Sequence, residues 1–277
     1  TDRFRWGVKD FDGCDAGRLM CALYNLETHP ATRDKPAQIV ANWDLDGIIE
    51  AGEIFNVTGG EFKTTFRSHC AHYAARAFRT WGLDALSPYE VFTGKSDSDG
   101  KMSLLEVSGH IGPMGAEPLL LEALELGMSA ETAYLADVLF AAQLEEYRET
   151  GVLTCVSEGP INRNPWFTYQ GLQFDAPGRT WATDTVDSLP EHKTAAFRRQ
   201  NLAISSKAAF LWAAYHDHPF SNILVDHVRT KARTPNGFAS SILQSTDTAS
   251  VNYTDINTNG IILQSIAHIF RERQVSL

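Results

Sequence analysis

One segment of the sequence is apolar on every side of a helix, and it restricts the fold more than any other feature. It covers residues 208–215 (AAFLWAAY), and residues 119–124 (LLLEAL) are nearly as apolar. A helix without a polar face is buried on all sides. A simple bundle consists mostly of helices with one polar face, whereas the inner ring of a toroid needs fully buried helices. We therefore expect an all-α fold, an (α/α) toroid.

Helical spacing of apolar residues extends over most of the rest of the chain. It predicts helices over residues 15–26, 61–81, 117–126, 129–148, 205–215, 219–231 and 259–271. Strand-like segments are short, and we interpret them as small β-hairpins on loops; they cover residues 48–49, 54–55 and 152–156. No linker rich in Pro, Gly or Ser divides the sequence, so residues 1–277 are predicted to form a single domain.

The composition argues against several classes of partner. The 24 basic and 34 acidic residues give a formal net charge of −10, so we expect no binding to nucleic acid or to an anionic membrane surface. The sequence contains no run of about 18 apolar residues, so it predicts no membrane span. The residues after Thr1 lack the pattern of a signal peptide. The four cysteines form no C-x-x-C pair, so we expect free thiols rather than a zinc ribbon.

Six motifs occur in one order along the chain, and together they resemble the bacterial DUF3131 family. They are residues 15–19 (DAGRL), 73–82 (YAARAFRTWG), 117–118 (EP), 147–158 (YRETGVLTCVSE), 205–210 (SSKAAF) and 257–263 (NTNGIIL). The resemblance extends from about Trp6 to the C-terminus. It implies a likeness to the α/α-toroid glycoside hydrolases, and a periplasmic or extracellular protein that accompanies polysaccharide synthesis or processing.

Two departures from the family pattern limit what the resemblance implies. The family usually has a helical segment before the DAGRL motif, so we expect that the toroid is incomplete here or is completed by another segment or a partner chain. Acidic residues often precede the YAA motif, whereas this chain has Ala71 and His72 there. No catalytic role is therefore carried over to these two positions.

The segment from Glu158 to Tyr169 holds the richest set of sugar-binding side chains. Arg163 and Trp166 lie between them, together with two asparagines. Aromatic faces pack on the apolar face of a pyranose, while amides and a guanidinium bind its hydroxyls. In the alternative interpretation, Glu158 pairs with Arg163 to hold the loop and Trp166 belongs to the core.

Hydrolysis of a glycosidic bond needs a second carboxyl group beside Glu158. We name Asp15 or Glu117 as its catalytic partner, and Asp184 and Asp255 as further candidates. Asp15 and Glu117 both stand at predicted helix starts, where a carboxylate also serves as a cap. Asp184 has the alternative role of a turn residue. The sequence does not select among these pairs, because the deciding variable is their separation.

Three further polar residues are candidates for binding substrate. Lys207 precedes the apolar helix, and a buried ammonium must find a partner. It is expected to bind substrate or to form an ion pair with Asp184 or Glu158. Asn257 and Asn259 open the last predicted helix, where one of them is an N-cap candidate and the other faces a ligand.

One loop has the spacing of a calcium site. Counted from Asn42, oxygen ligands fall at positions one, three, five and twelve, which are Asn42, Asp44, Asp46 and Glu53, with Gly47 at position six. This is the pattern of an EF-hand loop with Asn in place of the first Asp. The alternative is a hairpin turn at residues 46–47. Calcium is the one cofactor that the sequence suggests.

We therefore expect an exported carbohydrate-active protein that binds an oligo- or polysaccharide, and a glycoside hydrolase that acts on a bacterial polysaccharide by paired carboxylates. The alternative is a non-catalytic glycan-binding or scaffolding subunit of a system that makes or exports polysaccharide, since a fold does not fix its function. A third interpretation is a polysaccharide lyase with Tyr73 or His72 as the base.

Overall fold

The structure, a computed structural model, describes residues 10–33, 35–93, 102–175 and 178–275. The chain divides into two compact units, Thr1–Ile111 and Gly112–Leu277, and each is described by itself. The single-domain interpretation stays a prediction. The predicted all-α toroid is wrong, because the structure is mixed, with 52% helix, 18% strand and four small antiparallel sheets.

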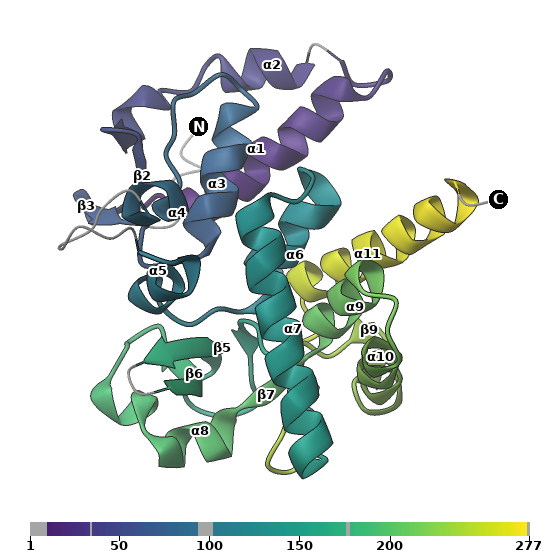
Figure 1. The fold of residues 1–277 in the computed structure, drawn as a ribbon. Coiled ribbons are helices and arrows are strands. Elements are labelled where there is room, and N and C mark those ends of the chain that lie inside the picture. Colours follow the sequence, from purple (N-terminus) through teal and green to yellow (C-terminus); the bar gives the residue numbers. More distant parts are fainter. Residues whose placement is uncertain (1–9, 34, 94–101, 176–177, 276–277) are drawn as a thin grey trace. The chain divides into compact units, whose positions relative to one another are not determined.

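Unit 1 combines five helices with a small sheet among its described residues (Figure 1). In chain order these are α1 (Gly13–Thr28), α2 (Lys35–Val40), a 3₁₀ turn (Asp46–Ile48), β1 (Ile49–Glu50), β2 (Glu53–Thr58), β3 (Glu61–Thr64), α3 (Cys70–Arg79), α4 (Pro88–Thr93) and α5 (Leu104–Ile111). The hairpin predicted around residues 48–55 is confirmed as β1–β2. The helix predicted over 61–81 begins only at Cys70, because residues 61–64 pair with β2 instead.

Helices α1 and α3 form the packed centre of unit 1. They approach closely at Gly17, where a Cβ atom would lie 2.6 Å from the Cα of Ala74. The side chain of Asp12 caps α1 by accepting hydrogen bonds from the backbone N–H groups of Cys14 and Asp15. The capping alternative for Asp15 is therefore wrong.

The residues named for a lyase are buried in α3. Tyr73 is 2% exposed and His72 is 5% exposed. The His72 Nδ1 atom lies 2.6 Å from the hydroxyl of Ser87, and the His72 ring stacks on Tyr89. Both side chains therefore belong to the core of unit 1 and are not exposed to solvent as a base that acts on a polysaccharide would be.

Unit 1 also holds a surface ion pair between the end of α3 and the start of α4. Arg79 Nη1 donates to Glu90 Oε1 at 2.8 Å, and the second nitrogen and oxygen complete a bidentate contact. The hydrogen bond from Arg79 lowers the pKa of Glu90, and the same bond raises the pKa of Arg79. Both side chains are more than a third exposed.

Unit 2 contains the remaining helices and three small sheets. Its elements are α6 (Ala116–Glu125), α7 (Ala130–Thr150), β4 (Gly159–Pro160), β5 (Phe167–Asp175), β6 (Gly178–Thr185), a 3₁₀ turn (Pro190–Lys193), α8 (Ala195–Asn201), β7 (Ala203–Ser205), α9 (Ser206–Tyr215), α10 (Pro219–Lys231), β8 (Arg233–Thr234), β9 (Gly237–Phe238), β10 (Ser241–Leu243), β11 (Thr248–Ala249) and α11 (Ile256–Val275). The helices predicted in this half of the chain are confirmed as α6, α7, α9, α10 and α11.

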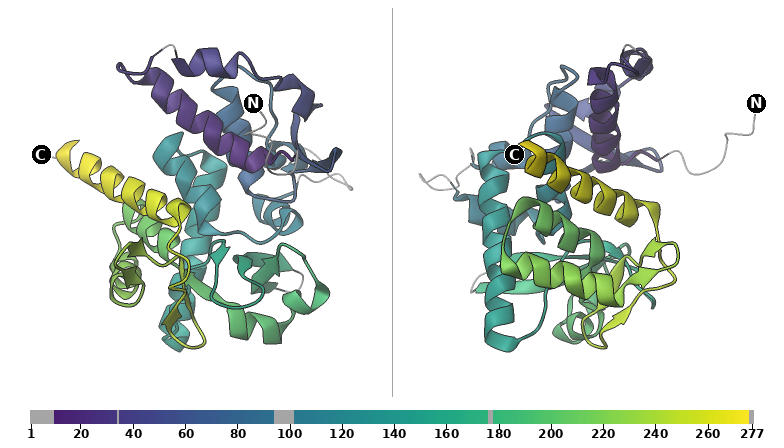
Figure 2. Two further views of the ribbon diagram at one scale, coloured as in Figure 1. Left: turned by 180° about the vertical axis from the view of Figure 1, so that it is seen from behind. Right: turned by 90° about the vertical axis from the view of Figure 1, so that its right-hand side faces the viewer.

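Helix α9 is the buried centre of unit 2, as its sequence predicts. Every residue from Ser206 to Trp212 is buried, because α6, α10 and α11 all pack against this helix (Figures 1 and 2). Its burial thus arises from three neighbouring helices and strand β7 rather than from an inner ring. A fully apolar helix predicts burial on all sides, but it does not specify which arrangement of neighbours provides the burial.

The strands β4, β5 and β6 form an antiparallel sheet that the helical interpretation missed. The register pairs Gly159 with Thr168 and Tyr169 with Asp184. Residues 152–156, predicted as a strand, lie outside the assigned strands; their carbonyls accept from the backbone N–H groups of Ala116 and Ser205. In Figures 1 and 2 the β5–β6 hairpin and α8 lie on one side of α7, while α9, α10 and α11 lie on the other.

All four cysteines are free thiols, as expected. Cys14, Cys21 and Cys70 lie in unit 1, and Cys155 lies in unit 2. Cys155 is completely buried, and this burial raises the pKa of its thiol strongly. None of the described helices combines the length and apolar composition that crossing a lipid bilayer requires.

Candidate functional site

The ammonium of Lys207 joins three polar side chains inside unit 2. Its Nζ atom forms an ion pair with Glu117 Oε2, lies 3.8 Å from Glu158 Oε1, and donates to Asn257 Oδ1 at 3.3 Å. We call these four residues the lysine cluster. The ion pair with Glu158 was one of those predicted, whereas the ion pair with Glu117 was not.

The helices that surround α9 bring the lysine cluster together. Lys207 stands in the first turn of α9, whose N-cap is Ser205. Glu117 stands in the first turn of α6 and Asn257 in the first turn of α11, and both helices pack on α9. The first turns of α6, α9 and α11, which are distant in sequence, therefore meet at the lysine cluster.

The cap of α11 is neither of the asparagines proposed from the sequence. The side chain of Asp255 accepts from the backbone N–H of Thr258 at 2.7 Å and from its hydroxyl at 3.0 Å. Asp255 thus occupies the N-cap role and is engaged there. Asn257 is thereby available to contact Lys207.

Exposure separates the two carboxylates of the lysine cluster. The side chains of Lys207 and Glu117 are 4% and 5% exposed, whereas that of Glu158 is 37% exposed. Removing a charged side chain from water is costly, so charges as buried as those of Lys207 and Glu117 need a partner of opposite charge. Glu117 and Lys207 satisfy each other, and Glu158 is the carboxyl group through which the cluster reaches the surface.

The sheet places Glu158 beside two other predicted site residues. Glu158 directly precedes β4, so by the register it lies level with Tyr169 of β5, which pairs with Asp184 of β6. Residues opposite each other on antiparallel strands share a face. Glu158 and Asp184 are two strand spacings apart at the backbone, about 10 Å, with Tyr169 between them.

Asp184 is half-buried and is held by its own turn. Its carboxylate accepts from the backbone N–H of Thr185 at 2.8 Å and from the hydroxyl of Ser188 at 3.0 Å. Lys193 lies 3.1 Å from the same carboxylate. The turn role is therefore confirmed, and the predicted ion pair between Asp184 and Lys207 is wrong because Lys193 takes that position.

Two aromatic rings of the segment from Glu158 to Tyr169 are open to solvent. Trp166 is 54% exposed and Tyr169 is 42% exposed, so the interpretation of Trp166 as a core residue is wrong. Trp166 stacks on Tyr253 with ring centroids 6.1 Å apart. Arg163 donates to the backbone carbonyl of Gln200 at 2.9 Å, and this bond, rather than the alternative ion pair with Glu158, holds the loop.

Asn259 serves the backbone rather than the lysine cluster. Its Oδ1 atom accepts from the N–H of Phe238 at 2.8 Å, and its Nδ2 atom donates to the carbonyl of the same residue at 3.0 Å. Gly237, at φ +127°, lets the amide approach, since a Cβ there would lie 2.4 Å from Asn259 Oδ1. Asn259 therefore fixes β9 to α11.

Asp15 and the calcium loop belong to unit 1. Asp15 is exposed on α1, and its pairing with Glu158 stays a prediction. In the loop, Glu53 accepts from Thr65 N at 3.2 Å, and the amide of Asn42 donates to the carbonyl of Gln38. The described residues contain no group of three or more His, Cys, Asp or Glu side chains that could hold a metal ion.

Sequence reasoning missed Glu117 as the closest partner of Lys207, and it missed Tyr253 as the ring behind Trp166. Ninety positions separate Glu117 from Lys207, so no local spacing connects them. A usable signal is the acidic residue at the start of one mostly apolar helix and the basic residue at the start of a fully apolar one, because such charges must be paired when their helices are buried.

Comparison with protein families supports the resemblance drawn from the six motifs. The model described as a protein of unknown function, DUF3131, matches residues 4–272. The chain belongs to the DUF3131 family. No curated protein and no solved structure matches it. The lysine cluster of this DUF3131 protein lies entirely within the matched residues.

Proposed function

We propose that this DUF3131 protein is an exported, periplasmic or extracellular, carbohydrate-active protein that hydrolyses a glycosidic bond in a bacterial polysaccharide. The observation that carries the proposal is the position of Glu158. It links a buried ammonium to the exposed ring of Tyr169, with which Glu158 lies level in the sheet. A sugar site needs such a combination of a carboxyl group and aromatic faces.

Trp166 and Tyr169 would form the platform for the sugar rings. Both are large rings with more than a third of their surface exposed, and Tyr253 supports Trp166 from behind. Ring faces of this kind pack on the apolar face of a pyranose. Glu158, which lies level with Tyr169 in the sheet, supplies a hydrogen-bonding carboxyl group beside that ring.

Glu158 would transfer a proton at the glycosidic bond, as general acid or base. It is the exposed carboxyl group of the lysine cluster, whereas Glu117 is too buried to reach a substrate. Glu117 is therefore a positioning residue, which holds Lys207 in place next to Glu158. This assignment replaces the catalytic role that the sequence suggested for Glu117.

Asp184 is the candidate for the base that activates water. Two carboxyl groups on either side of Tyr169, on strands about 10 Å apart at the backbone, suit the separation of about 6.5–9.5 Å found in inverting enzymes. Lys193 and the turn hydrogen bonds fix the orientation of the Asp184 side chain. Inversion of the anomeric centre is the stereochemical outcome that follows.

Replacement of Glu158 by glutamine tests the proposal. We expect kcat for release of reducing sugar from a panel of bacterial exopolysaccharides to fall by about 100-fold or more, while binding of the same glycan is retained. Glu149→Gln is the matched control, because Glu149 is an exposed carboxylate of α7 outside the lysine cluster. Undiminished turnover by Glu158→Gln would contradict the proposal.

A non-catalytic glycan-binding role is the second candidate. It is favoured by the contacts of Asp184, whose two oxygens are both engaged by its own turn and Lys193. A binding subunit would need only the aromatic platform. In that case Trp166→Ala would weaken glycan binding, and wild-type protein would release no sugar from any glycan that it binds.

A further inference from the structure

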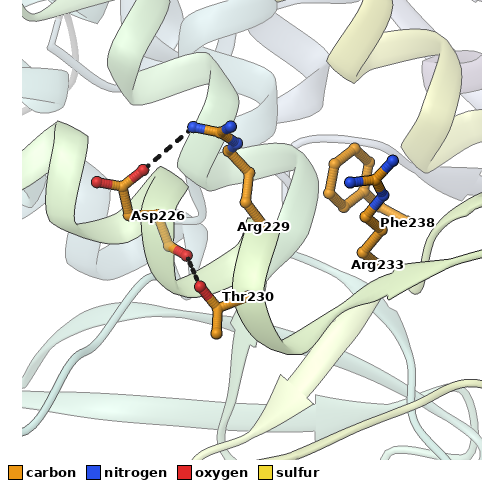
Figure 3. Close-up of a pocket in the computed structure, with 5 residues that line it drawn as sticks. All are labelled: Asp226, Arg229, Thr230, Arg233 and Phe238. Carbon is orange, nitrogen blue, oxygen red and sulfur yellow. Dashed lines mark hydrogen bonds and ion pairs between the residues drawn. The ribbon is translucent and has the colours of Figure 1, made fainter.

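A second surface feature of unit 2 has a character opposite to that of the chain as a whole. Residues of α10, β8 and β9 line a hollow of about 350 Å³ (Figure 3). Its lining contains two arginines and one aspartate together with Thr230 and Phe238, so it carries a net positive charge in a chain of net charge −10. The volume is that of a small-molecule site.

The two guanidinium groups of the hollow differ in their partners. Arg229 donates to Asp226, one turn earlier on α10, at 3.3 Å. Arg233 has no hydrogen bond or ion pair from its side chain within the described ranges 10–33, 35–93, 102–175 and 178–275. Arg233 therefore offers a complete set of donors to a ligand, and Arg229 can add a second set by exchanging its partner.

One residue that lines the hollow is a fixed aromatic ring beside Arg233. Phe238 of β9 pairs directly with Arg233 of β8, and in Figure 3 the two side chains lie beside each other. The Phe238 ring also packs on Phe210 of α9, with centroids 5.4 Å apart. Since both backbone groups of Phe238 are bound by Asn259, its position is determined before any ligand arrives.

We propose that this hollow binds a sugar unit that bears an anionic group, a carboxylate or a phosphate. The guanidinium fork of Arg233 matches either group in a bidentate geometry. The ring of Phe238 offers a flat apolar face to the pyranose, and the hydroxyl of Thr230 is a further polar group in the lining. That the ligand is a sugar rests on the proposed function, whereas the preference for an anion rests on the arginines alone.

Titration calorimetry of the whole chain in low-salt buffer tests this proposal with three probes: glucuronate, glucose 6-phosphate and glucose. We expect one or both anionic sugars to bind and glucose to bind at least about tenfold more weakly, because charge-assisted hydrogen bonds are absent for it. Tighter binding of glucuronate assigns the site to carboxylate, and tighter binding of glucose 6-phosphate assigns it to phosphate. Equal binding of all three probes would overturn the proposal.

Variants locate the binding in the hollow. Arg233→Gln should weaken the anionic probe about tenfold or more, while Arg233→Lys, which keeps the charge but not the fork, should recover only part of the affinity. Arg148→Gln, an exposed arginine of α7, is the matched control and should bind as wild type. Unchanged affinity in Arg233→Gln would overturn the proposal.

The hollow and the lysine cluster give separable readouts. Glu158→Gln should leave binding of the anionic probe unchanged, since Glu158 is not among the lining residues. Loss of probe binding in Arg233→Gln together with full hydrolysis by Glu158→Gln would remove the proposed function and keep the anion site. The reverse pattern would remove the anion site and keep the hydrolase.

Discussion

Two ion pairs of this protein have similar partners and opposite surroundings. In unit 1, Arg79 and Glu90 meet at the surface, with 37% and 45% of their side chains exposed. In unit 2, Lys207 and Glu117 meet in the core, with 4% and 5% exposed. Water can replace either partner of the first pair, but neither partner of the second. Burial therefore decides what each pair contributes to stability and which of them controls a neighbouring group.

The largest expected effect is the loss of the buried ammonium. Lys207→Met removes the ammonium that neutralises Glu117 in the core, and we expect the free energy of unfolding to fall by about 3–5 kcal/mol. Urea denaturation followed by circular dichroism measures the change. Lys231→Met is the control, because Lys231 pairs with Asp247 at the surface. Equal stability of the two variants would remove the distinction between buried and exposed pairs.

Removal of both buried charges should restore most of that loss. In the double variant Glu117→Leu/Lys207→Met, apolar side chains replace the pair, and we expect stability within about 1 kcal/mol of wild type or above it. The same denaturation experiment measures this change. If the double variant is as unstable as Lys207→Met, then the contact of Lys207 with Glu158 or Asn257, rather than that with Glu117, stabilises unit 2.

Removal of the surface pair should have a small effect. Arg79→Met or Glu90→Gln is expected to lower the free energy of unfolding by about 1 kcal/mol or less, because exposed pairs are screened by water and salt. Unfolding in 0.15 M and 1 M salt checks this, since the difference from wild type should shrink at the higher salt. A loss as large as that of Lys207→Met would break the comparison.

The pH dependence of the surface pair is the finest test. Because the hydrogen bond from Arg79 lowers the pKa of Glu90 below its ordinary value of 4.5, the pair stabilises the folded state above that value. The contribution is lost as pH falls through the lowered pKa of the folded state. The small difference between wild type and Glu90→Gln should therefore be full at pH 7 and should vanish in strong acid. A constant difference would contradict this.

The sequence predicts the helices α6 and α9 better than it predicts the buried ion pair between them, Lys207 with Glu117. The apolar pattern of residues 208–215 is local, so α9 and its burial follow from it. The contact of Lys207 with Glu117 depends on how α6 packs on α9, and that is a long-range property. The sequence placed Lys207 in a buried ion pair but named Glu158 and Asp184 as partners, of which only Glu158 lies within reach.

The toroid prediction failed where strands have weak local signals. The two strands of the β5–β6 hairpin, FTYQGLQFD and GRTWATDT, place polar residues at both alternating sets of positions, so no apolar stripe distinguishes them. The prediction of a helix over residues 61–81 is wrong for residues 61–64, because their own periodicity does not reveal that they pair with β2. Helix starts and stops were more reliable, since Ser129 and Gly151 bound α7 by local capping chemistry.

The hollow at α10 shows a signal that the sequence does contain. Arg229 stands in the last turn of α10 and Arg233 follows four positions later in β8, so their closeness in the sequence places both at the end of this helix. The aromatic ring could not be read in the same way, because Phe238 reaches the arginines only through the β8–β9 turn. The net charge of −10 gives no sign of this site, because it is a sum over the whole chain and one small basic region hardly changes it.

The distribution of the thiols gives each unit its own chemical reporter. Cys155 is the one cysteine of unit 2, and its burial and raised thiol pKa keep it from reacting. A thiol reagent modifies a thiolate, and therefore reaches Cys155 only when unit 2 opens. Cys21, buried in α1, reports on unit 1 in the same way. Peptide-resolved alkylation rates would thus show whether the two units open together or in turn.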